Sequence, residues 1–423
     1  MSNRLARRVA GFGTTIFTEM SALAVQHGAI NLGQGFPDSA GPDFVKQAAA
    51  AAIAADLNQY APMPGLPHLR QAVAAEWQRK HGRAVDWQTE VTVTSGATEA
   101  LCDAALALLD PGDQAIILEP AYDAYAPDVI MAGAAPIYVK LYPPTTDHPF
   151  DFAQGRRPPT TDESPPVQSS VVSRRSSSWH LDADELRAAF TGRPKLILLN
   201  TPHNPTGKVF SRAELELIAA LCQEYDVLAI ADEVYDRMVY DQAEHVSLAT
   251  LPGMWDRTLT LNSVGKTFSV TGWKIGYAVG PAALNQALRA AHQWVTFATS
   301  TPFQEATAVA LERAAMNGYY QQLHAEYDQR RLLLREMLES AGLPTLPVEG
   351  SYFISADISA LGFADDRAFC RFLTTELGVA AIPTSAFYAD PAAAPAIARF
   401  CFAKKRETLE AAGERLQRLR ERV

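Results

Sequence analysis

Two lysines stand eight residues apart in the segment SVGKTFSVTGWKIG, residues 263–276, where most other side chains are small, aromatic or apolar. Lys266 and Lys274 could each supply an amine for covalent chemistry or a cation for an anionic ligand. The letters GKT suggest the phosphate-binding loop of nucleotide hydrolases. That motif needs a glycine five residues before Gly265, however, and the chain has Thr260 there. A nucleotide-binding protein is therefore only a remote alternative.

Other polar residues follow predicted strands at the point where each strand ends. Gly96, Ala97 and Thr98 follow EVTVTS and open a predicted helix, whose free N–H groups and dipole suit a phosphate. Ligands of open α/β sheets bind at the carboxyl ends of the strands, so we expect residues there to share one site. The further candidates are Asn204 after KLILLN, Asp232 and Tyr235 in VLAIADEVY, and Ser263 and Lys266 after TLTLNS. Each alone also fits a helix cap, a turn or a solvated surface; the combination favours a site.

The elements that must position these residues form an α/β pattern. Seven short β-rich runs alternate with helical patterns from about residue 90, which predicts a mainly parallel seven-stranded sheet sandwiched by helices. Only about ten residues separate TLTLNS from KIGYAVG, fewer than a parallel crossover needs. We therefore predict that KIGYAVG is the one antiparallel strand and that both lysines lie near the loop before it.

The pattern also suggests how the chain is divided. We predict a large domain over residues 41–290, a smaller α+β domain over 291–423, and an N-terminal segment, 1–40, that packs with the smaller domain. Residues 145–177 are rich in Pro, Ser, Thr and Arg and show no sustained period, so we predict a disordered surface insertion there.

Composition limits the partners. The formal net charge of −10 gives no basic field for a polyanion, so we expect neither nucleic acid nor an acidic membrane surface as a partner, and a small-molecule substrate instead. The four cysteines form no CxxC pair, which predicts neither a metal site nor a disulfide framework. The basic start lacks an uninterrupted apolar run, and we expect a cytoplasmic protein.

Eight blocks in order carry a resemblance to a known family. They are INLGQGFPD, QYAPMPGLPHLRQA, TSGATEA, EPAYDAY, NTPHNPTGK, ADEVY, SVGKTFSVTGWKIG and ARFCFAKK. The chain resembles, from about residue 14 to its end, the class I aminotransferases of fold type I that depend on pyridoxal phosphate (PLP), in the branch with kynurenine and methionine aminotransferases. The insertion at 145–177 is the chief departure from that pattern.

The resemblance implies roles for the residues that would carry the chemistry. Lys266 matches the lysine that holds the PLP aldehyde covalently, and Lys274 matches a phosphate contact. Asp232 matches the carboxylate beside the pyridinium nitrogen, while Asn204 and Tyr235 match donors to the 3-oxygen. Lys266, Asp232 and Tyr235 are the implied catalytic residues.

Further residues are implied to bind cofactor or substrate. Tyr122 matches the aromatic that stacks on the PLP ring; Gly96, Ala97, Thr98 and Ser263 match the phosphate cradle. Arg399, with Asn204 and the backbone of Gly35, matches the site of the substrate carboxylate. Tyr60 matches a residue that reaches the phosphate from a second subunit, which implies a homodimer.

The implied activity is a ping-pong transfer of an amino group from an L-amino acid, aromatic or sulfur-containing, to a 2-oxo acid. Two alternatives on the same fold stay open at this point. One is a carbon–sulfur β-lyase acting on cysteine conjugates, which needs the same residues. The other, more remote, is a ligand sensor that binds without turnover.

Overall fold

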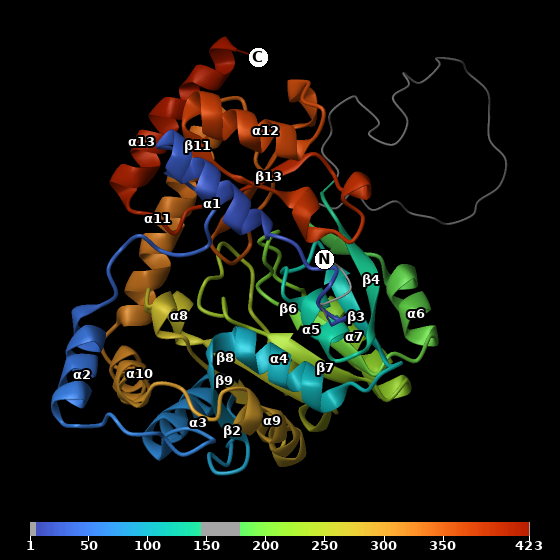
Figure 1. Cartoon of the computed structure of the whole chain (residues 1–423), viewed down its shortest axis with the longest axis vertical. Helices are drawn as coiled ribbons and strands as arrows, with labels where there is room; N and C mark the ends of the chain where they lie inside the picture. The colour runs from blue at the N-terminus through green and yellow to red at the C-terminus, as the bar shows by residue number, and fades with distance from the viewer. Residues whose placement is uncertain (1–5, 145–177, 423) are drawn as a thin grey trace.

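One sheet of eight strands organises the larger part of the molecule (Figure 1). In spatial order the strands are β2 (Val91–Ser95), β9 (Ile275–Val279), β8 (Thr258–Ser263), β7 (Leu228–Asp232), β6 (Leu196–Asn200), β3 (Gln114–Glu119), β4 (Ala135–Tyr142) and β5 (His180–Leu181). The computed structural model describes residues 6–144 and 178–422. The predicted insertion at 145–177 lies outside the described residues.

Strand direction agrees with the prediction for the seven longer strands. β9 is antiparallel to both of its neighbours, β2 and β8, and the other long strands pair in parallel. The predicted seven-stranded sheet with one antiparallel strand is thus confirmed for these strands. The eighth strand, β5, pairs antiparallel with β4 and is only two residues long, too short to show a sequence period.

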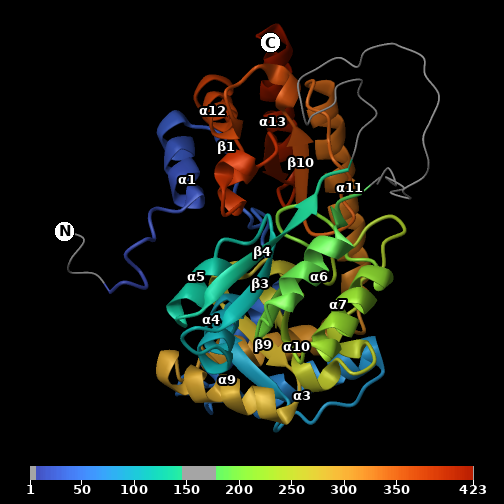
Figure 2. The same ribbon diagram turned by 90° about the vertical axis from the view of Figure 1, so that its right-hand side faces the viewer.

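Helices cover both faces of this sheet, which explains why β6 and β7 are apolar up to their last residues, Asn200 and Asp232. On one face, α6 (Ala183–Thr191) and α7 (Arg212–Glu224) pack on Ile197 and Leu199 of β6. On the other face, α4 (Gly96–Leu108), α5 (Tyr125–Met131) and α9 (Ala282–Val295) pack on Leu196 and Leu198. Figure 2 shows the sheet between these two layers.

A third apolar cluster closes the edge of the sheet at β2. It joins residues of α2 (Asp43–Ala54), α3 (Pro67–His81) and α10 (Thr301–Ala314) to the buried side chains of β2 and β9. The short helix α8 (Val264–Thr267) lies between β8 and β9 and carries Lys266. Both predicted lysines therefore stand in the connection that reverses the chain.

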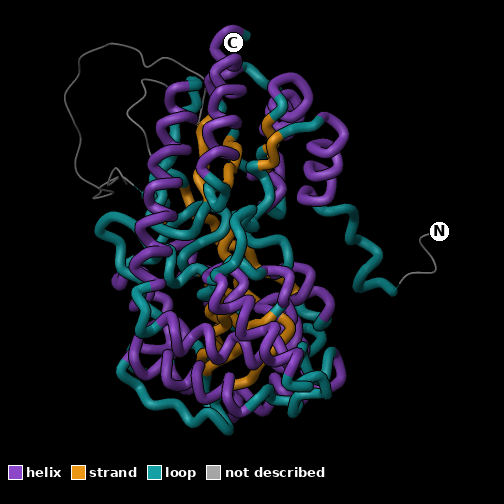
Figure 3. The backbone as a smooth tube through the Cα atoms, turned by 90° about the vertical axis from the view of Figure 1, so that its left-hand side faces the viewer, coloured by secondary structure: helices purple, strands orange, loops and turns teal. Residues whose placement is uncertain are grey.

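The rest of the chain forms a smaller α+β layer above the carboxyl ends of the sheet (Figure 1). Its strands β10 (Phe353–Asp357), β13 (Ile397–Cys401) and β12 (Ile382–Pro383) pair antiparallel and are covered by α11 (Tyr319–Ser340), α12 (Asp366–Phe372) and α13 (Arg406–Gln417). Figure 3 shows these strands among the helices.

The start of the chain lies in this smaller layer. The helix α1 (Ile16–His27) packs there, and β1 (Ile30–Asn31) pairs in parallel with β11 (Val379–Ala380). The described residues before α1 extend away from the body of the molecule (Figure 3). The division into 1–40, 41–290 and 291–423 stays a proposal, and α10, which it assigns to the smaller domain, packs with α2 and α3 at the edge of the large sheet. Among the described residues, no helix is both long and apolar enough to cross a membrane.

The hairpin of β4 and β5 makes the first prediction. Leu141 pairs with Leu181 and Tyr142 with His180, so the two ends that flank residues 145–177 are held side by side. Replacing 145–177 by a short Gly/Ser linker should leave the melting temperature equal or slightly higher, because a shorter loop costs less closure entropy. Differential scanning calorimetry measures this.

Trp179, next to the same hairpin, provides the control. Its side chain is buried, and Trp179→Ala should lower stability by about 3–5 kcal/mol through the cavity it leaves. A linker variant that loses as much stability as Trp179→Ala would show that residues 145–177 contribute to the folded core.

Candidate active site

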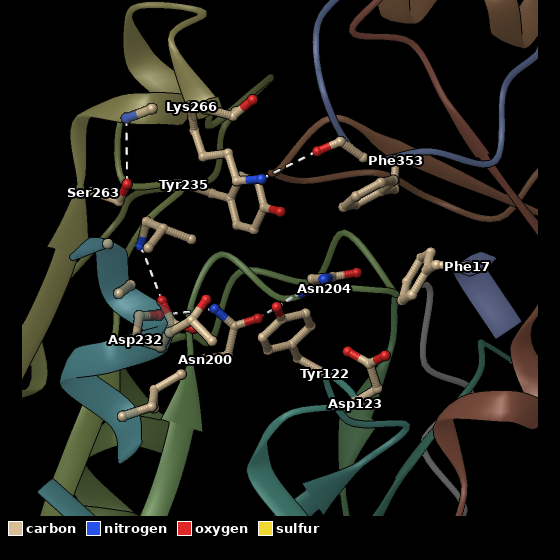
Figure 4. A pocket seen from close by; sticks show the side chains of 18 of the residues that line it. Phe17, Tyr122, Asp123, Asn200, Asn204, Asp232, Tyr235, Ser263, Lys266 and Phe353 are labelled. Atoms are coloured by element: carbon tan, nitrogen blue, oxygen red, sulfur yellow. Dashed lines mark hydrogen bonds between the residues drawn. The ribbon is translucent and has the colours of Figure 1, made fainter. Parts of the chain in front are cut away.

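A cavity of about 390 Å³ opens between the carboxyl ends of the sheet and the smaller layer. Twelve of the residues that the sequence predicts line it: Gly35, Gly96, Ala97, Thr98, Tyr122, Asn204, Asp232, Tyr235, Ser263, Lys266, Lys274 and Arg399. Tyr60 does not; its side chain is 86% exposed and contacts the Phe297 ring on the surface. Eight of these twelve were predicted from strand ends, and Figure 4 shows how the labelled side chains converge.

Lys266 projects into the cavity from α8, a helix of one turn. Ser263 begins this turn, and its hydroxyl accepts a hydrogen bond from the Gly265 N–H at 3.3 Å. The Lys266 amine donates to the carbonyl of Gly35 at 3.1 Å (Figure 4). Burial lowers the pKa of this amine to about 8. In a fraction of the molecules this amine is therefore uncharged near neutral pH, and the uncharged form is the nucleophile.

Asp232 ends β7 at the base of the cavity and is buried. Its carboxylate accepts hydrogen bonds from the Tyr125 hydroxyl at 2.7 Å and from the Val234 N–H at 3.3 Å. Burial raises the pKa of Asp232, and the hydrogen bond from Tyr125 opposes this. A buried carboxylate in this position can pair with a cationic group of a ligand.

Asn200, which the sequence analysis missed, fixes the neighbouring loop. Its amide donates to the Asp232 carbonyl at 2.8 Å, and its own carbonyl accepts from the Asn204 N–H at 2.7 Å. It is the last residue of β6, so the rule used for the other strand ends could have found it. The two asparagines thus link β6 and β7 across the cavity floor.

The first turn of α4 and Lys274 face each other closely. A Cβ atom on Gly96 would lie 3.5 Å from the Lys274 Nζ, and Gly96 has a φ of +75° that favours glycine. Lys274 has no ion-pair partner among the described residues. Free backbone N–H groups at a helix start and an unpaired ammonium group together suit a phosphate.

Arg399 enters the cavity from β13 and is fully buried. Its Nη1 donates to the Asn204 side-chain oxygen and its Nη2 to the Gly33 carbonyl, both at 2.8 Å. Its Nε is buried without a hydrogen-bond partner among the described residues. Burial lowers the pKa of the guanidinium to about 10, so it stays charged at neutral pH. A buried cation with a free donor is suited to a carboxylate.

Aromatic side chains close the cavity around these charges. Tyr122 and Tyr235 line it, and the Tyr235 ring meets Tyr352 edge to face at 5.0 Å. Phe353 lies under Arg399, with 3.9 Å between the guanidinium carbon and the ring centre, and Phe17 stands at 5.2 Å. The sequence analysis missed both phenylalanines, because nothing in α1 or in SYFISADIS marks a residue that faces a site.

The buried side chain of His292 contacts α4, the helix that begins at Gly96. The His292 Nδ1 lies 2.9 Å from a Glu99 oxygen and 3.4 Å from an Asp103 oxygen, and its Nε2 donates to the Met63 carbonyl at 3.1 Å. Glu99 also accepts a hydrogen bond from the Ser95 N–H. The first turn of α4 is therefore tied to α9 through one imidazole.

The comparisons with known proteins agree on one family. The sequence profile described as "Aminotransferase class I and II" matches residues 27–155 and 166–416. The chain is 42% identical to a probable N-succinyldiaminopimelate aminotransferase of Mycobacterium tuberculosis, over 98% of each chain. It is 40% identical to kynurenine–oxoglutarate transaminase 1 of Rattus norvegicus, over 100% of this chain and 99% of the relative.

A solved structure gives the same result for the fold. The chain is similar to an Escherichia coli protein whose crystal structure and reactivity identify a methionine aminotransferase function. The TM-score is 0.86 and the identity 39%, over 98% of this chain and 99% of the other.

His292 makes the second prediction. Burial alone would lower the pKa of its imidazole, but Asp103 and Glu99 raise it to about 9. A raised pKa means that the charged form stabilises the fold fully below the unfolded pKa of about 6.5, and that this gain is lost as the pH rises through 9. His292→Gln should therefore cost about 3–5 kcal/mol at pH 6.5 and progressively less towards pH 10.

Urea unfolding of the protein and the variant between pH 6 and 10 measures this difference. His27→Gln, at the exposed end of α1, is the control and should change stability little at any pH. A cost of His292→Gln that is constant with pH would show that the imidazole is neutral.

Proposed function

The chain belongs to the class I and II aminotransferases and is a PLP-dependent enzyme, and from that premise we propose that it transfers the amino group of an aromatic or sulfur-containing L-amino acid to a 2-oxo acid. The relatives named for kynurenine and methionine support this substrate class. The observation that carries the proposal is a single cavity in which a nucleophilic amine, a buried carboxylate, a phosphate cradle and a buried guanidinium face one another.

The residues present fit PLP. Lys274, the helix start at Gly96 and the hydroxyl of Ser263 together suit its phosphate, and Asp232 suits its pyridinium nitrogen. The bound cofactor supplies an aldehyde that combines with amines and a ring that withdraws electrons from the substrate Cα. Thr98 and the backbone of Ala97 line the same end of the cavity and complete the proposed phosphate cradle.

Lys266 is the proposed catalytic amine. With a pKa of about 8 its amine would hold the cofactor aldehyde covalently. The same Nζ, when free, would take the proton from the substrate Cα. Because the nucleophile and the base are the same group, loss of Lys266 should remove both functions.

Asp232 and the donors around it adjust the charge of the cofactor ring. The hydrogen bond from Tyr125 helps to keep the carboxylate of Asp232 ionised, and the carboxylate in turn favours a protonated ring nitrogen. Asn204 and Tyr235 are the proposed donors to the ring oxygen, and Tyr122 the proposed stacking partner. These roles are carried over from the family pattern and stay proposals.

Arg399 is the proposed anchor for the α-carboxylate of the substrate. The hydrogen bonds to Asn204 and Gly33 fix the plane of the guanidinium and use one N–H each of Nη1 and Nη2, so the second N–H of each nitrogen is the proposed donor to the ligand. The Gly35 carbonyl accepts a hydrogen bond from Lys266, and the Gly33 carbonyl accepts one from Arg399. The backbone of residues 33–35 therefore contacts both charged groups. A fixed anchor holds the Cα–H bond near the Lys266 amine.

A homodimer is part of the proposal. The rings of Tyr60 and Phe297 are in contact on the surface, and Trp294, three residues before Phe297, is exposed as well; Tyr60 and Trp294 are 86% and 84% exposed. Exposed patches of this kind commonly mark protein interfaces. We propose that Tyr60 reaches the phosphate of a second subunit, and that the enzyme acts in the cytoplasm, in keeping with its four free cysteines.

The two lysines make the third prediction. Lys266→Ala should still bind PLP through the phosphate and ring contacts but lose the covalent link and almost all transamination. Lys274→Ala should keep the covalent link and bind PLP more loosely, because one charge-assisted contact of roughly 1.5–3 kcal/mol is lost. Mass spectrometry after borohydride reduction locates the label, and an assay with methionine and a 2-oxo acid measures turnover.

A label on Lys274, or normal turnover by Lys266→Ala, would contradict the assignment. Omission of the 2-oxo acid provides the control: it should stop turnover of methionine after the first half-reaction, whereas a β-lyase that is given a cysteine S-conjugate would continue to form pyruvate, ammonia and the released thiol.

The patch around Tyr60 makes the fourth prediction. Trp294→Ser should weaken self-association, since it removes a large exposed aromatic from the proposed interface, and should reduce activity in parallel. Sedimentation velocity over a range of concentrations measures the association. Met316→Ser, at another side chain that is 82% exposed, is the matched control and should change neither property. A fully active monomer would contradict the proposed dimer.

A further inference from the structure

The carbonyl of Gly35 accepts two hydrogen bonds, and only one of the two donors has a role in the proposed function. The Lys266 amine donates to it at 3.1 Å, and the Tyr352 hydroxyl donates to the same oxygen. A carbonyl oxygen has two lone pairs, so it holds both donors at once. Tyr352 lies outside the described lining of the cavity, and no step of the proposed reaction uses it.

Tyr352 is held in place from several sides. Its side chain is fully buried, and its ring meets those of Tyr235 and Phe353 edge to face, with ring centres 5.0 and 4.8 Å apart. Its backbone carbonyl accepts a hydrogen bond from the Phe402 N–H at 3.0 Å. Close packing of this kind leaves a side chain few alternative rotamers. The hydroxyl of Tyr352 therefore has a fixed place behind the cavity wall.

The position of Gly35, in contrast, is not set by a helix or a strand. It lies between β1, which ends at Asn31, and α2, which begins at Asp43, in a stretch without regular secondary structure. Its backbone rests on aromatic rings instead: a Cβ atom on Gly35 would lie 2.8 Å from the Phe353 Cζ and 3.7 Å from the Tyr352 Cε2. The place of the Gly35 carbonyl thus depends on these rings and on the hydroxyl that donates to it.

The hydrogen bond to this carbonyl also sets the direction in which the Lys266 amine acts. An uncharged amine has two N–H bonds and one lone pair in a tetrahedral arrangement. When one N–H is donated to the Gly35 carbonyl, the lone pair that takes a proton points away from that carbonyl. The charged form of the amine is favoured by the same acceptor and by the Tyr352 ring, whose centre lies 5.7 Å from the Nζ.

We propose that Tyr352 is a positioning residue for the catalytic amine: its hydroxyl holds the Gly35 carbonyl at the place where that carbonyl receives the Lys266 Nζ whenever the amine is free. The inference rests on the proposed function, because it takes Lys266 as the group that holds PLP and moves the proton. An amine held by one fixed acceptor begins each proton transfer from the same geometry. Without the hydroxyl, the carbonyl is free to turn away, and the buried ammonium form of Lys266 loses its acceptor.

The test removes the hydroxyl of Tyr352 and keeps its ring. At saturating PLP, the rate at which the PLP-free full-length chain forms its covalent link follows the uncharged fraction of the Lys266 amine, whose pKa is about 8. Tyr352→Phe should move the midpoint of this pH profile down by about one unit, because the charged form loses a hydrogen bond while the ring contact stays. Stopped-flow absorbance measures the rate.

The other charged or titratable groups around the Lys266 amine stay unchanged in this variant. They are Asp232, Tyr235, Lys274, Arg399 and Cys401. A second variant, Gly35→Ala, leaves Tyr352 unchanged as well and displaces the carbonyl, because its Cβ does not fit beside Phe353. It should lower the midpoint in the same way.

Turnover separates positioning from substrate binding. With methionine and a 2-oxo acid, Tyr352→Phe should lower kcat by about tenfold or more, because the amine no longer starts from a fixed place. KM for methionine should change much less, since Tyr352 contacts none of the proposed substrate groups. With methionine deuterated at Cα, the isotope effect on kcat should rise, because proton transfer then limits the rate more strongly.

Tyr327→Phe is the matched control. Tyr327 is also buried, and its ring stacks on that of Tyr352 with ring centres 6.2 Å apart, but the Gly35 carbonyl takes its two hydrogen bonds from Tyr352 and Lys266. The control should change neither the midpoint nor kcat.

Three outcomes have distinct meanings. A lower midpoint in Tyr352→Phe and Gly35→Ala, but not in Tyr327→Phe, supports the proposal. A midpoint that stays the same or rises in Tyr352→Phe overturns it, even where Lys266 is the catalytic amine. If Lys266→Ala still forms the covalent link with PLP, the proposed function fails, and this inference fails with it.

Discussion

The close approach of β9 to the first turn of α4 is the contact on which the site depends. A Cβ atom on Gly276 would lie 2.5 Å from the Gly96 carbonyl carbon and 2.7 Å from the Ala97 nitrogen, so only glycine fits between these backbones. This approach follows from the antiparallel pairing of β2 and β9, in which Ser95 lies opposite Ile275. It sets Lys274 against the helix start, and the short return from β8 carries Lys266 to the same cavity. One reversed strand thus positions both amines.

Burying the charged groups of the cavity costs stability, and a ligand that carries the opposite charges can offset this cost. Burial lowers the pKa of Lys266 and Arg399 and raises that of Asp232, so each group is held in surroundings that disfavour its charged form. Within the part of the chain that the structure describes, the Arg399 Nε has no hydrogen-bond partner and the Lys274 ammonium group no ion-pair partner, so these charges are also incompletely satisfied. A ligand that pairs with these groups binds the folded state only and therefore stabilises it. The cavity is in this sense prepared for an anionic, ring-shaped molecule.

Loop lengths and the positions of strand ends, both of which can be read from short stretches of sequence, predicted the part of the site that lies on the sheet. The loop length before KIGYAVG predicted the antiparallel strand, and the ends of β2, β6, β7 and β8 predicted eight of the residues that line the cavity. The same rule could have found Asn200 but was not applied to it. Phe17 and Phe353 could not be found in this way, because they lie in α1 and β10, far apart in the sequence, and come to Arg399 only through the packing of the smaller layer. The strand β5 was not predicted, because two residues are too few to show an alternation of apolar and polar side chains.

The cavity has two sides: the sheet carries the proposed catalytic groups, and the opposite wall faces the proposed position of the substrate side chain. The sheet supplies the proposed catalytic groups, Lys266 and Asp232, from strand ends whose spacing is fixed by backbone hydrogen bonds. The opposite wall combines a loop residue, Asp123, with aromatic side chains from α1 and β10, which hold their places by side-chain packing. Packing of that kind tolerates exchange of side chains better than a strand ladder does. Relatives that share about 40% of the sequence can therefore keep one reaction and still carry names for three different amino donors.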